Sequence, residues 1–391
     1  MHQLEEQLTD KQAAIDDWFT AQFQATPAPI YASVDLRHSG FKFSPIDTNC
    51  FPAGFNNLHA DSLSLAAKAF SEALPESCQR VLLATENHTR NQFYLENVAA
   101  LAALIKAAGK EVRMTNFRDD LTESLHLELA SGKELVFEPM QRRDDAIHVG
   151  DFVPDVILLN NDLSDGEPDI LKNLTQPILP SPGMGWQQRK KSQHFACFQR
   201  VSEQFSEAFG LEPWFLSPLF RNCGMVDFMK REGEDCLIRN ARALFHQIEE
   251  KYETHGIQEK PFIVVKADAG TYGMGIMMVH DPMELRDLNR KQRTHMAASK
   301  GHQKITQVIL QEGVHSIDKH DGATAEPVVY MVNGDVVGGF YRLHPDKLAD
   351  ENLNAPGMVF HPLAPDLPRA YQVLARLAAL AVAHEQQGIN A

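Results

Sequence analysis

Apolar residues in the first half of the chain form short continuous runs and one long helical pattern. Residues 81–84 ("VLLA"), 111–117 ("EVRMTNF") and 155–160 ("DVILLN") predict buried strands. Between the first two, residues 92–110 carry apolar side chains at helical spacing, and Gly109 is a plausible stop. Strand, helix and strand in this order favour a parallel α/β unit with right-handed crossovers, which we place at roughly residues 30–185.

The pattern changes in the second half. The Pro- and Gly-rich stretch at 177–186 predicts a linker or a loop between domains, and a helix with a basic N-terminal end follows it. From residue 261 short β-branched runs dominate, and Asn333-Gly334-Asp335 between alternating apolar residues predicts a hairpin. A closing helix is expected with Asp366 as its N-cap. We therefore expect three regions: 1–185, 186–260 and 261–391.

Composition places the chain among globular proteins and limits its partners. It has 391 residues, of which 43% are hydrophobic and 23% charged, enough for two or three domains. A formal net charge of −15 disfavours nucleic acid and anionic membrane as partners, since both are polyanions. We expect no signal peptide and no membrane span. The five scattered cysteines, without a Cys-x-x-Cys pair, favour a reducing, cytoplasmic location.

A glycine-rich loop is the first candidate for chemistry. In residues 264–279, "VVKADAGTYGMGIMMV", Lys266 precedes three glycines whose order matches neither a dinucleotide-binding turn nor a P-loop. A second strand is expected after the loop, and the next helix is expected to begin only at Asp281. There Asp281, Pro282 and Glu284 form a capping pattern. Strand, loop and strand predict a flap whose backbone N–H groups fold over a triphosphate. A plain hairpin beside a solvated lysine explains the loop alone equally well.

Three later segments favour the nucleotide interpretation. Residues 307–314 ("QVILQEGV") predict a strand whose edge could bind adenine as a hinge. The predicted hairpin carries Glu326 at one end and Arg342 at the other, and "ENLNAPG" at 351–357 follows it. An arginine close to an Asn-Leu-Asn element suits a phosphoryl group and a metal-bound phosphate. Taken singly, each of these residues is more often an ordinary strand or surface residue.

In this order, the lysine strand, glycine flap, hinge strand and arginine hairpin resemble the ATP-grasp superfamily of carboxylate–amine ligases. The segments at 34–58 ("VDLRHSGFKFSPIDTNCFPAGFNNL") and 185–195 ("GWQQRKKSQHF") narrow the match. Together they are similar to the proteobacterial type of glutamate–cysteine ligase over about residues 30–365. The resemblance implies an α/β and α+β fold of ATP-grasp architecture. Its parallel α/β substrate-side domain would come first, then a helical linking part, then an antiparallel nucleotide-binding region with the flap.

The resemblance also implies a reaction, the first step of glutathione biosynthesis. ATP would phosphorylate the γ-carboxylate of L-glutamate, and the amine of L-cysteine would attack the acyl phosphate to give γ-glutamylcysteine, ADP and phosphate. Positive side chains and Mg²⁺ in a water-excluded site would stabilise the developing charge. The implied cofactors are ATP and Mg²⁺, and the implied partners are the two amino acids. The oligomeric state is not indicated.

Residue by residue, the resemblance gives catalytic roles to Lys266 and Arg342. Lys266 matches the lysine of the flap strand, and Arg342 matches the arginine near the transferred phosphate. Lys190 or Lys191 matches an earlier nucleotide-contacting lysine, and Glu312 is a candidate for the ribose hydroxyls. The implied nucleotide-binding set is Lys191, Lys266, Gly270, Thr271, Tyr272, Gly273, Gly275, Gln311, Glu312 and Val314.

One element of the superfamily pattern is missing. A late Glu-x-Asn pair usually binds Mg²⁺, but here the last helix runs through Glu385 and is followed only by "QQGINA". Asp47 and Asn49 have the same spacing, which puts both side chains on one face of an extended segment. We therefore hypothesise that the N-terminal element docks into the nucleotide site and supplies metal ligands, substrate contacts or both. The metal candidates are Glu326, Asn352, Asn354 and Asp47.

Polar residues mixed with aromatics at 35–57 are expected to recognise the amino acids, although a structured loop with Asn caps would look similar. Arg37 could bind an α-carboxylate through two hydrogen bonds. Residues after the parallel strands lie where open α/β sheets bind ligands. The candidate substrate residues are Arg37, Lys42, Asp47, Asn49, Asn56, Asn57, Arg90 and Asn160.

Two alternatives stay open at this level. The chain could be another ATP-grasp ligase, for example one like glutathione synthetase, because substrate choice depends on side chains that the sequence does not place. It could also be a catalytically idle nucleotide-binding protein, which the missing metal pair would favour.

Overall fold

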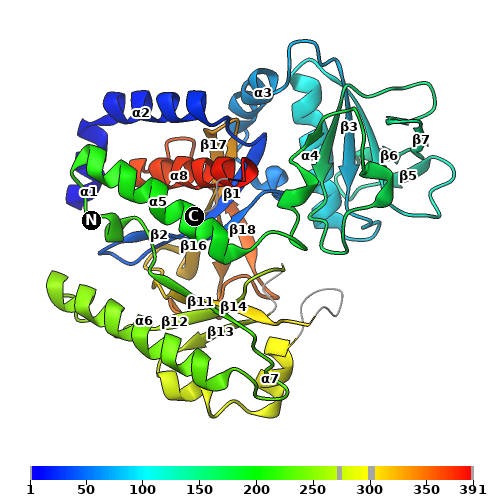
Figure 1. Cartoon of the computed structure of the whole chain (residues 1–391). Coiled ribbons are helices and arrows are strands. Elements are labelled where there is room, and N and C mark those ends of the chain that lie inside the picture. Colours follow the sequence, from blue (N-terminus) through cyan, green and yellow to red (C-terminus); the bar gives the residue numbers. More distant parts are fainter. Residues whose placement is uncertain (1, 271–274, 298–303, 389–391) are drawn as a thin grey trace.

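The computed structural model describes residues 2–270, 275–297 and 304–388. A central sheet joins two further bodies, an α/β domain and a lower lobe (Figure 1). The central sheet has the strand order β18 (Val359–Pro362), β17 (Asp335–His344), β16 (Ala323–Val332), β1 (Tyr31–His38) and β2 (Phe43–Asn49), and β15 (Lys319–His320) pairs with β16.

The first two strands of the chain are built into a sheet that the last third of the chain completes. β1 pairs antiparallel with β16, so that Tyr31 lies opposite Val332 and Asp35 opposite Val328. Because side chains alternate along a strand, Ala32, Val34 and Leu36 of β1 enter the apolar core on one side. The positions between them face the other side, which is therefore available for polar groups.

Helices cover the apolar side. α8 (Arg369–Gln386) packs against β1, β16 and α5, and its alanines and leucines are buried on nearly every side. The others are α1 (His2–Asp10), α2 (Gln12–Ala25) and α5 (Lys191–Phe209). The prediction that Asp366 caps α8 is wrong: Pro368 holds the N-cap position. The free N–H groups of Arg369 and Ala370 are instead satisfied by Glu5 of α1, a partner that no local pattern reveals.

The α/β domain has the predicted parallel core. β3 (Arg80–Thr85) lies between β4 (Glu111–Asn116) and β9 (Val156–Asn160), both parallel to it, and these strands and α4 (Gln92–Ala107) confirm the prediction. β10 (Ile178–Leu179), β6 (Glu134–Phe137) and β5 (Leu125–Glu128) complete the sheet, and β7 (Gln141–Arg143) and β8 (Ala146–His148) form a separate hairpin. The remaining elements are α3 (Ser62–Ala73) and the 3₁₀ turns η1 (Phe55–Asn57), η2 (Asp169–Leu171) and η3 (Pro182–Met184).

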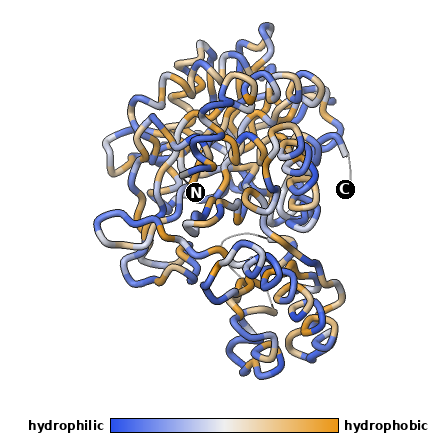
Figure 2. The backbone as a smooth tube through the Cα atoms, turned by 90° about the vertical axis from the view of Figure 1, so that its left-hand side faces the viewer, coloured by the Kyte–Doolittle hydropathy of each residue, from blue (hydrophilic) through white to orange (hydrophobic). Residues whose placement is uncertain are grey.

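The lower lobe is an antiparallel sheet covered by a long helix. Its strand order is β11 (Phe220–Gly224), β14 (Gln307–Glu312), β12 (Ile263–Ala267) and β13 (Ile276–Val279). Its helices are α6 (Glu234–His255) and α7 (Arg290–Ala297), with 3₁₀ turns η4 (Pro213–Phe215) and η5 (Pro282–Leu285). The lobe has an apolar core of its own, and Figure 2 shows it as a separate lower body.

Two local predictions are confirmed in this half of the chain. β12 and β13 are antiparallel neighbours, so the glycine loop does join two strands. Asp281 does cap the next element, through a hydrogen bond from Met283 N–H to its carboxylate at 2.8 Å, although that element is only a 3₁₀ turn. The predicted hairpin is β16–β17, and Asn333 (φ 54°) and Gly334 (φ 81°) both adopt the left-handed conformation that a tight two-residue turn requires.

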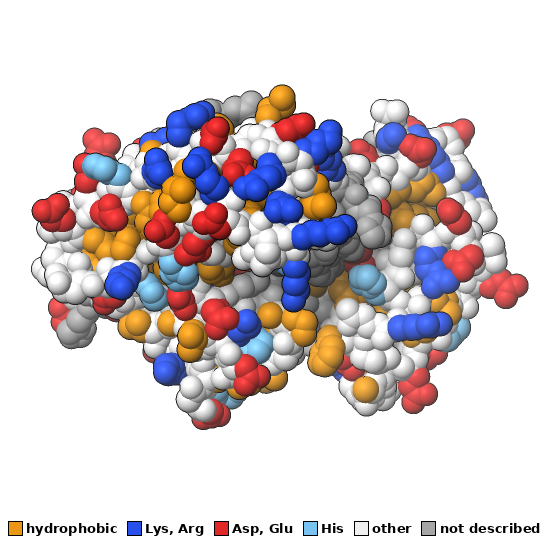
Figure 3. Space-filling model, turned by 90° about the horizontal axis from the view of Figure 1, so that it is seen from below, with side chains coloured by type: hydrophobic (Ala, Val, Ile, Leu, Met, Phe, Trp, Pro, Cys, Tyr) orange, Lys and Arg blue, Asp and Glu red, His pale blue; other side chains and the backbone are white. Residues whose placement is uncertain are grey.

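The three predicted regions do not coincide with these bodies one by one, since the central sheet takes strands from the first and the third. The boundaries stay a prediction. The five cysteines are free thiols. In the part of the chain that the structure covers, no helix combines the length and the apolar character needed to cross a bilayer. Acidic and basic side chains are interspersed over the face that Figure 3 shows.

Candidate functional site

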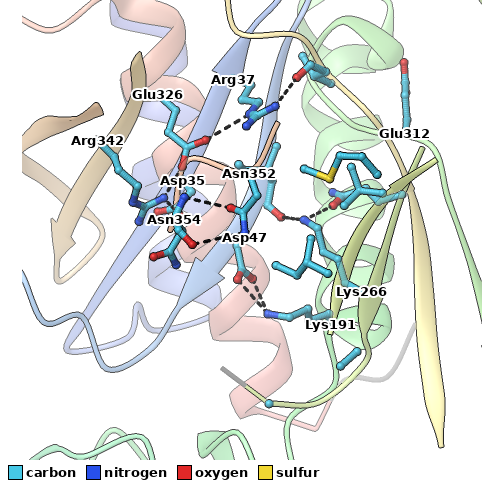
Figure 4. A pocket seen from close by; sticks show the side chains of 18 residues that line it. Asp35, Arg37, Asp47, Lys191, Lys266, Glu312, Glu326, Arg342, Asn352 and Asn354 are labelled. Atoms are coloured by element: carbon cyan, nitrogen blue, oxygen red, sulfur yellow. Dashed lines mark hydrogen bonds and ion pairs between the residues drawn. The ribbon is translucent and has the colours of Figure 1, made fainter. Parts of the chain in front are cut away.

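The polar face of the central sheet and the lower lobe enclose a space that we call cavity A. It measures about 780 Å³ including its open mouth, and Figure 4 shows its side chains. Central-sheet strands supply carboxylates and arginines, and β12, β13 and β14 supply apolar groups and Lys266. Cavity A is lined by Asp35, Arg37, Ile46, Asp47, Lys191, Val264, Lys266, Ala267, Gly270, Ile276, Met278, Gln311, Glu312, Val314, Glu326, Arg342, Asn352 and Asn354.

A second space, cavity B, lies between the central sheet and the α/β domain. It measures about 1040 Å³ including its mouth. Aromatic side chains and amides dominate its wall, and Glu86 and Asp162 come from the carboxyl ends of β3 and β9. Cavity B is lined by Ser33, Asp35, Asp47, Asn49, Phe51, Ala53, Gly54, Asn57, Glu86, Tyr94, Asn160, Asp162, Trp186, Val328, Tyr330, Phe340, Arg342, Asn354, Met358 and Phe360.

The two cavities meet. Asp35, Asp47, Arg342 and Asn354 line both of them, so we call these four residues the junction. Asp35 and Asp47 are direct cross-strand partners on β1 and β2. Arg342 Nη1 donates to Asp35 Oδ2 at 2.8 Å and to Glu326, while its buried Nε has no hydrogen-bond partner among the described residues. The arginine therefore keeps a donor for a further acceptor.

Two lysines face the junction from cavity A. Lys191, at the start of α5, donates to both Asp47 oxygens at 2.8 and 2.9 Å. Lys266, on β12, donates to the Ile46 carbonyl at 2.6 Å and to Gln311 Oε1 at 2.7 Å. Burial lowers the pKa of Lys266 to about 8, against the opposing attraction of Asp47. The two ammonium groups thus approach one anion-sized space from different elements.

The two junction carboxylates have different proton affinities. Burial raises the pKa of Asp35, and the Glu326 charge adds to this effect against the attraction of Arg342. For Asp47 burial acts in the same sense, but Lys191 and Lys266 outweigh it and lower the pKa below its usual value. Neighbouring carboxylates with opposite shifts are typical of sites where one group stays charged and the other exchanges a proton.

Arg37 does not have the free guanidinium that the sequence analysis expected for an α-carboxylate. Its Nε donates to Glu326 at 3.2 Å, and Nη1 donates to the carbonyls of Val314 and Ala349 at 3.1 and 3.2 Å. Nη2 donates to the Glu351 carbonyl at 2.5 Å. Four of five N–H groups are thus occupied by the protein, and Arg37 holds together the segments that carry the cavity wall.

Lys42 and Glu312 also differ from the sequence interpretation, because they are partners of each other. Lys42 Nζ donates to Glu312 Oε2 at 2.9 Å, and both side chains are fully buried. Trp214 Nε1 and the Leu219 N–H donate to the same carboxylate. Lys42 therefore lies too deep to contact a substrate. Glu312 lines cavity A, but its carboxylate already accepts these hydrogen bonds, and its contact with a ribose stays a prediction.

The remaining candidates divide between the cavities and the surface. Asn49, Asn57 and Asn160 line cavity B, although Asn160 donates to the Pro52 carbonyl and accepts from Asn97. Asn56 and Arg90 are exposed and lie outside both cavities as the described residues define them. Gly270 lines cavity A, and Gly275 (φ 63°) immediately precedes β13. Thr271, Tyr272 and Gly273 lie outside the described residues.

Several cavity residues were not found from the sequence. Asp35 is a single acidic residue in an apolar strand, and its alternation with Ser33 and Arg37 was the one available signal. Trp186 lies in the predicted linker and in the segment 185–195 that carries the resemblance, but it was given no role of its own. It lines cavity B and packs under Lys191, whose Nζ lies 3.9 Å from the ring centroid. Such a cation–π contact depends on the fold of the loop, not on spacing.

The chemistry of the donor set is compatible with a hard divalent cation. Asp35, Asp47 and Glu326 offer carboxylates, and Asn352 and Asn354 offer amide oxygens, around one space. No group of three or more His, Cys, Asp or Glu side chains able to hold a metal was found in the described ranges. Mg²⁺ is commonly bound by one or two carboxylates together with substrate phosphates, so a complete protein cage is not required.

Comparison with protein families gives one match that spans nearly the whole chain. The model of the glutamate-cysteine ligase family matches residues 5–386. Among solved structures, a protein of Methylobacillus flagellatus KT assigned as a gamma-glutamylcysteine synthetase is 46% identical and has a TM-score of 0.91. The alignment covers 99% of this chain and 96% of that one. The comparison with curated proteins found no match.

Two remote likenesses accompany that match. A glutathione synthetase-like effector from Globodera pallida is 10% identical with a TM-score of 0.41, over 92% of this chain and 84% of that one. The D-alanyl-alanine synthetase A of Vibrio cholerae O1 biovar eltor str. N16961 is 11% identical with a TM-score of 0.36, over 80% and 81%. Neither is similar enough to carry an argument.

Proposed function

The chain belongs to the glutamate-cysteine ligase family, and we propose that cavity A holds ATP while cavity B holds the two amino acids. We assign its fold, which it shares with the similar structure from Methylobacillus flagellatus KT, to the ATP-grasp architecture that the sequence resemblance implied. It is an ATP-dependent ligase that forms γ-glutamylcysteine from L-glutamate and L-cysteine. Neither the family match nor the similar structure favours the two alternatives that the sequence left open.

In the nucleotide site, the adenine lies among Val264, Ile276 and Met278, with Gln311 and Val314 of the hinge at its edge. Lys266 and Lys191 hold phosphate oxygens as point charges. The Lys191 ammonium leaves Asp47 when a phosphate takes its place, because a triphosphate offers more negative charge than one carboxylate. The apolar walls keep water from the phosphates, which strengthens these contacts.

At the junction, the γ-carboxylate of glutamate reaches the γ-phosphorus of ATP from the side of cavity B. A carboxylate oxygen attacks the phosphorus, the bond to the bridging oxygen breaks, and ADP leaves. Arg342 directs its unused Nε–H at the transferred phosphoryl group and stabilises the charge that develops there. The Asp35–Arg342 hydrogen bond orients the guanidinium for this task.

The acyl phosphate then reacts with cysteine. The cysteine ammonium gives a proton to Asp35, whose raised pKa suits a temporary acceptor. The free amine attacks the acyl carbon, an amide bond forms, the carbon–oxygen bond to phosphate breaks, and the second amine proton leaves with the phosphate. Glu86 and Asp162, on the far wall of cavity B, suit the ammonium group of a bound amino acid.

For the metal we propose Mg²⁺, held by Asp47, Glu326, Asn352 and Asn354. When bound, the ion would neutralise phosphate charge and polarise the phosphoryl group. The other steps depend on the side chains described above.

The single observation that carries this assignment is the junction, because a ligase must bring a phosphoryl donor and a carboxylate acceptor together in one enclosed space. The test is phosphate release from ATP and Mg²⁺ with L-glutamate and L-cysteine, each omitted in turn. We expect release coupled to γ-glutamylcysteine only when both are present. Release with neither amino acid, or coupled to another amine, would contradict the assignment.

A further inference from the structure

A buried arginine behind the junction ties the two segments that present Asp47 and Lys191. Arg189 Nη1 donates to the Thr48 carbonyl at 2.6 Å. Thr48 stands between Asp47 and Asn49 on β2, and Arg189 stands two residues before Lys191. The Arg189 guanidinium also packs on the Trp186 ring, with its Cζ 5.0 Å from the ring centroid. The Lys191 ammonium group lies over the same ring.

The same guanidinium is fixed by the last helix of the chain. Arg189 Nε and Nη2 donate to the two oxygens of Glu385 at 2.8 and 3.1 Å, a bidentate pair, and His194 Nδ1 contacts Glu385 Oε1. The side chains of Arg189, Glu385 and His194 are 3%, 8% and 2% exposed. A buried bidentate pair of this kind allows one orientation of the arginine side chain, because the guanidinium is planar and the directions of its N–H groups are fixed.

We propose that Arg189, held by Glu385, is a positioning residue that keeps Asp47 and Lys191 aligned at the junction. Neither Arg189 nor Glu385 belongs to the described lining of cavity A or B, so neither is expected to touch a ligand. Their effect passes through the Thr48 carbonyl to β2 and through the chain from 189 to 191. The roles of Asp47 and Lys191 in this inference rest on the proposed function. The contacts of Arg189 do not depend on it.

The charge balance supports a permanent pair. Burial by itself would raise the pKa of Glu385, but the charge of Arg189 and the hydrogen bonds with Arg189 and His194 lower it to about 2. Burial lowers the pKa of His194 itself, so the permanent positive charge beside Glu385 is that of Arg189. Glu385 is therefore ionised throughout the working range of an enzyme, and the Arg189 charge is matched. Without that carboxylate, a third cation would stand uncompensated behind Lys191 and Lys266.

The test uses substitutions that keep the size of the side chain. Arg189→Lys keeps the charge but loses the bidentate pair, and Glu385→Gln keeps the shape but loses the charge. We expect each to lower kcat/KM for ATP about ten- to a hundredfold, because a misplacement on the order of 1 Å has that effect. We further expect the dissociation constant of ATP for the enzyme alone to rise, while the KM for glutamate changes less than threefold.

The matched control is Arg376→Lys on the same helix. Arg376 pairs with Asp16 of α2 through Nη1 and is also largely buried, but it lies outside both cavities as described. Its variant should lower the thermal unfolding midpoint with ATP binding unchanged. The double variant Arg189→Met/Glu385→Leu should fold, since apolar replacement of a buried pair is often tolerated, and still bind ATP poorly.

Two outcomes would overturn the proposal. One is folded Arg189→Lys and Glu385→Gln proteins with wild-type ATP affinity and kcat. The other is a loss of affinity in Arg376→Lys as large as theirs, which would make the effect one of general stability. Because ATP affinity is measured without amino acids, a wild-type protein that failed to ligate them would contradict the proposed function and leave this test valid.

Discussion

At the residue scale, the two lysines of cavity A differ in how their charges are matched. Lys191 is paired with Asp47, whereas Lys266 is held by two neutral oxygens, the Ile46 carbonyl and the Gln311 amide. Neutral acceptors orient an ammonium group without cancelling its charge. Lys266 therefore retains more attraction for an anion, and its burial makes that attraction dependent on pH.

The first prediction follows from the pKa of Lys266, which burial lowers to about 8. Phosphate needs the protonated form, which the free enzyme holds below that pH and loses above it. We expect kcat/KM for ATP to be highest below about pH 8 and to fall as the pH rises through it. Lys266→Arg keeps its charge and should abolish this decline if it folds and binds ATP. A decline of equal size and position in the variant would count against the assignment.

The second prediction concerns Arg342. Arg342→Lys keeps one positive charge near Asp35 and Glu326 but cannot direct an Nε–H at the phosphoryl group. We expect kcat to fall about a hundredfold or more, with the KM for ATP within about threefold, because the contact is made mainly in the transition state. Steady-state kinetics measures both. The control is Arg113→Lys, an arginine of the α/β domain paired with Glu138. Equal losses in both variants would remove Arg342 from the mechanism.

At the element scale, the β16–β17 hairpin brings Glu326 and Arg342 opposite each other in direct register. Its turn lies at the far end, roughly 26 Å from Arg342 if eight residues each advance about 3.3 Å. The turn, together with an irregularity in the pairing between Tyr330 and Met331, therefore sets the register of Glu326 and Arg342 without touching the cavity. Local sequence was sufficient to predict it, because Asn and Gly tolerate the positive φ angles that a two-residue turn needs.

The third prediction tests that turn with Gly334→Ala. A Cβ at Gly334 would lie 2.8 Å from Phe23 Cε2 on α2, and φ is 81°. Gly132→Ala is a matched control, since Gly132 has φ 78° and no described atom within 4 Å of an added Cβ. We expect both to lose on the order of 1 kcal/mol from the backbone, and Gly334→Ala to lose more because of the clash. Chemical denaturation measures the free energy of unfolding of both variants. Equal losses would show that α2 shifts to accommodate the added methyl group without a cost in stability.

At the scale of the whole molecule, one buried ion pair fastens the N-terminal hairpin to the lower lobe. Lys42, in the connection between β1 and β2, reaches Glu312 at the end of β14, with Trp214 beneath its ammonium group. The pair explains how a segment from the start of the chain is held over a strand from its last third.

The fourth prediction follows from the burial of that pair. Lys42→Met leaves the Glu312 carboxylate buried without its cation, which typically costs about 3–5 kcal/mol. Lys42→Met/Glu312→Leu removes both charges and should recover a large part of this loss. Urea denaturation of the two variants gives the comparison. If the double variant is no more stable than the single one, the lost stability comes from packing and not from the unpaired charge.

A structural feature could be predicted from the sequence where residues close together in the chain determine it. The strands and helix of the α/β domain, the strand–loop–strand around the glycines and the Asn333-Gly334 turn all follow from short-range patterns, and the structure has them. The pairing of β1 with β16 has no local signal. Arg37, Lys42 and Glu312 were expected to meet ligands because a polar residue in an apolar segment looks the same whether its partner is a substrate or a distant side chain.

The same topology has a consequence during biosynthesis. β1 leaves the ribosome early, but its neighbour β16 follows roughly 300 residues later, which at about 5–20 residues per second takes roughly 15–60 s. For that time one edge of the β1–β2 hairpin has no partner, and open edges invite pairing with other chains. Glu385, which fixes Arg189, is made later still. An unfinished chain therefore has Lys191 and Lys266 without the Glu385–Arg189 pair. If the proposed function and the proposed role of this pair hold, the chain should be unable to consume ATP efficiently before residue 385 has been made.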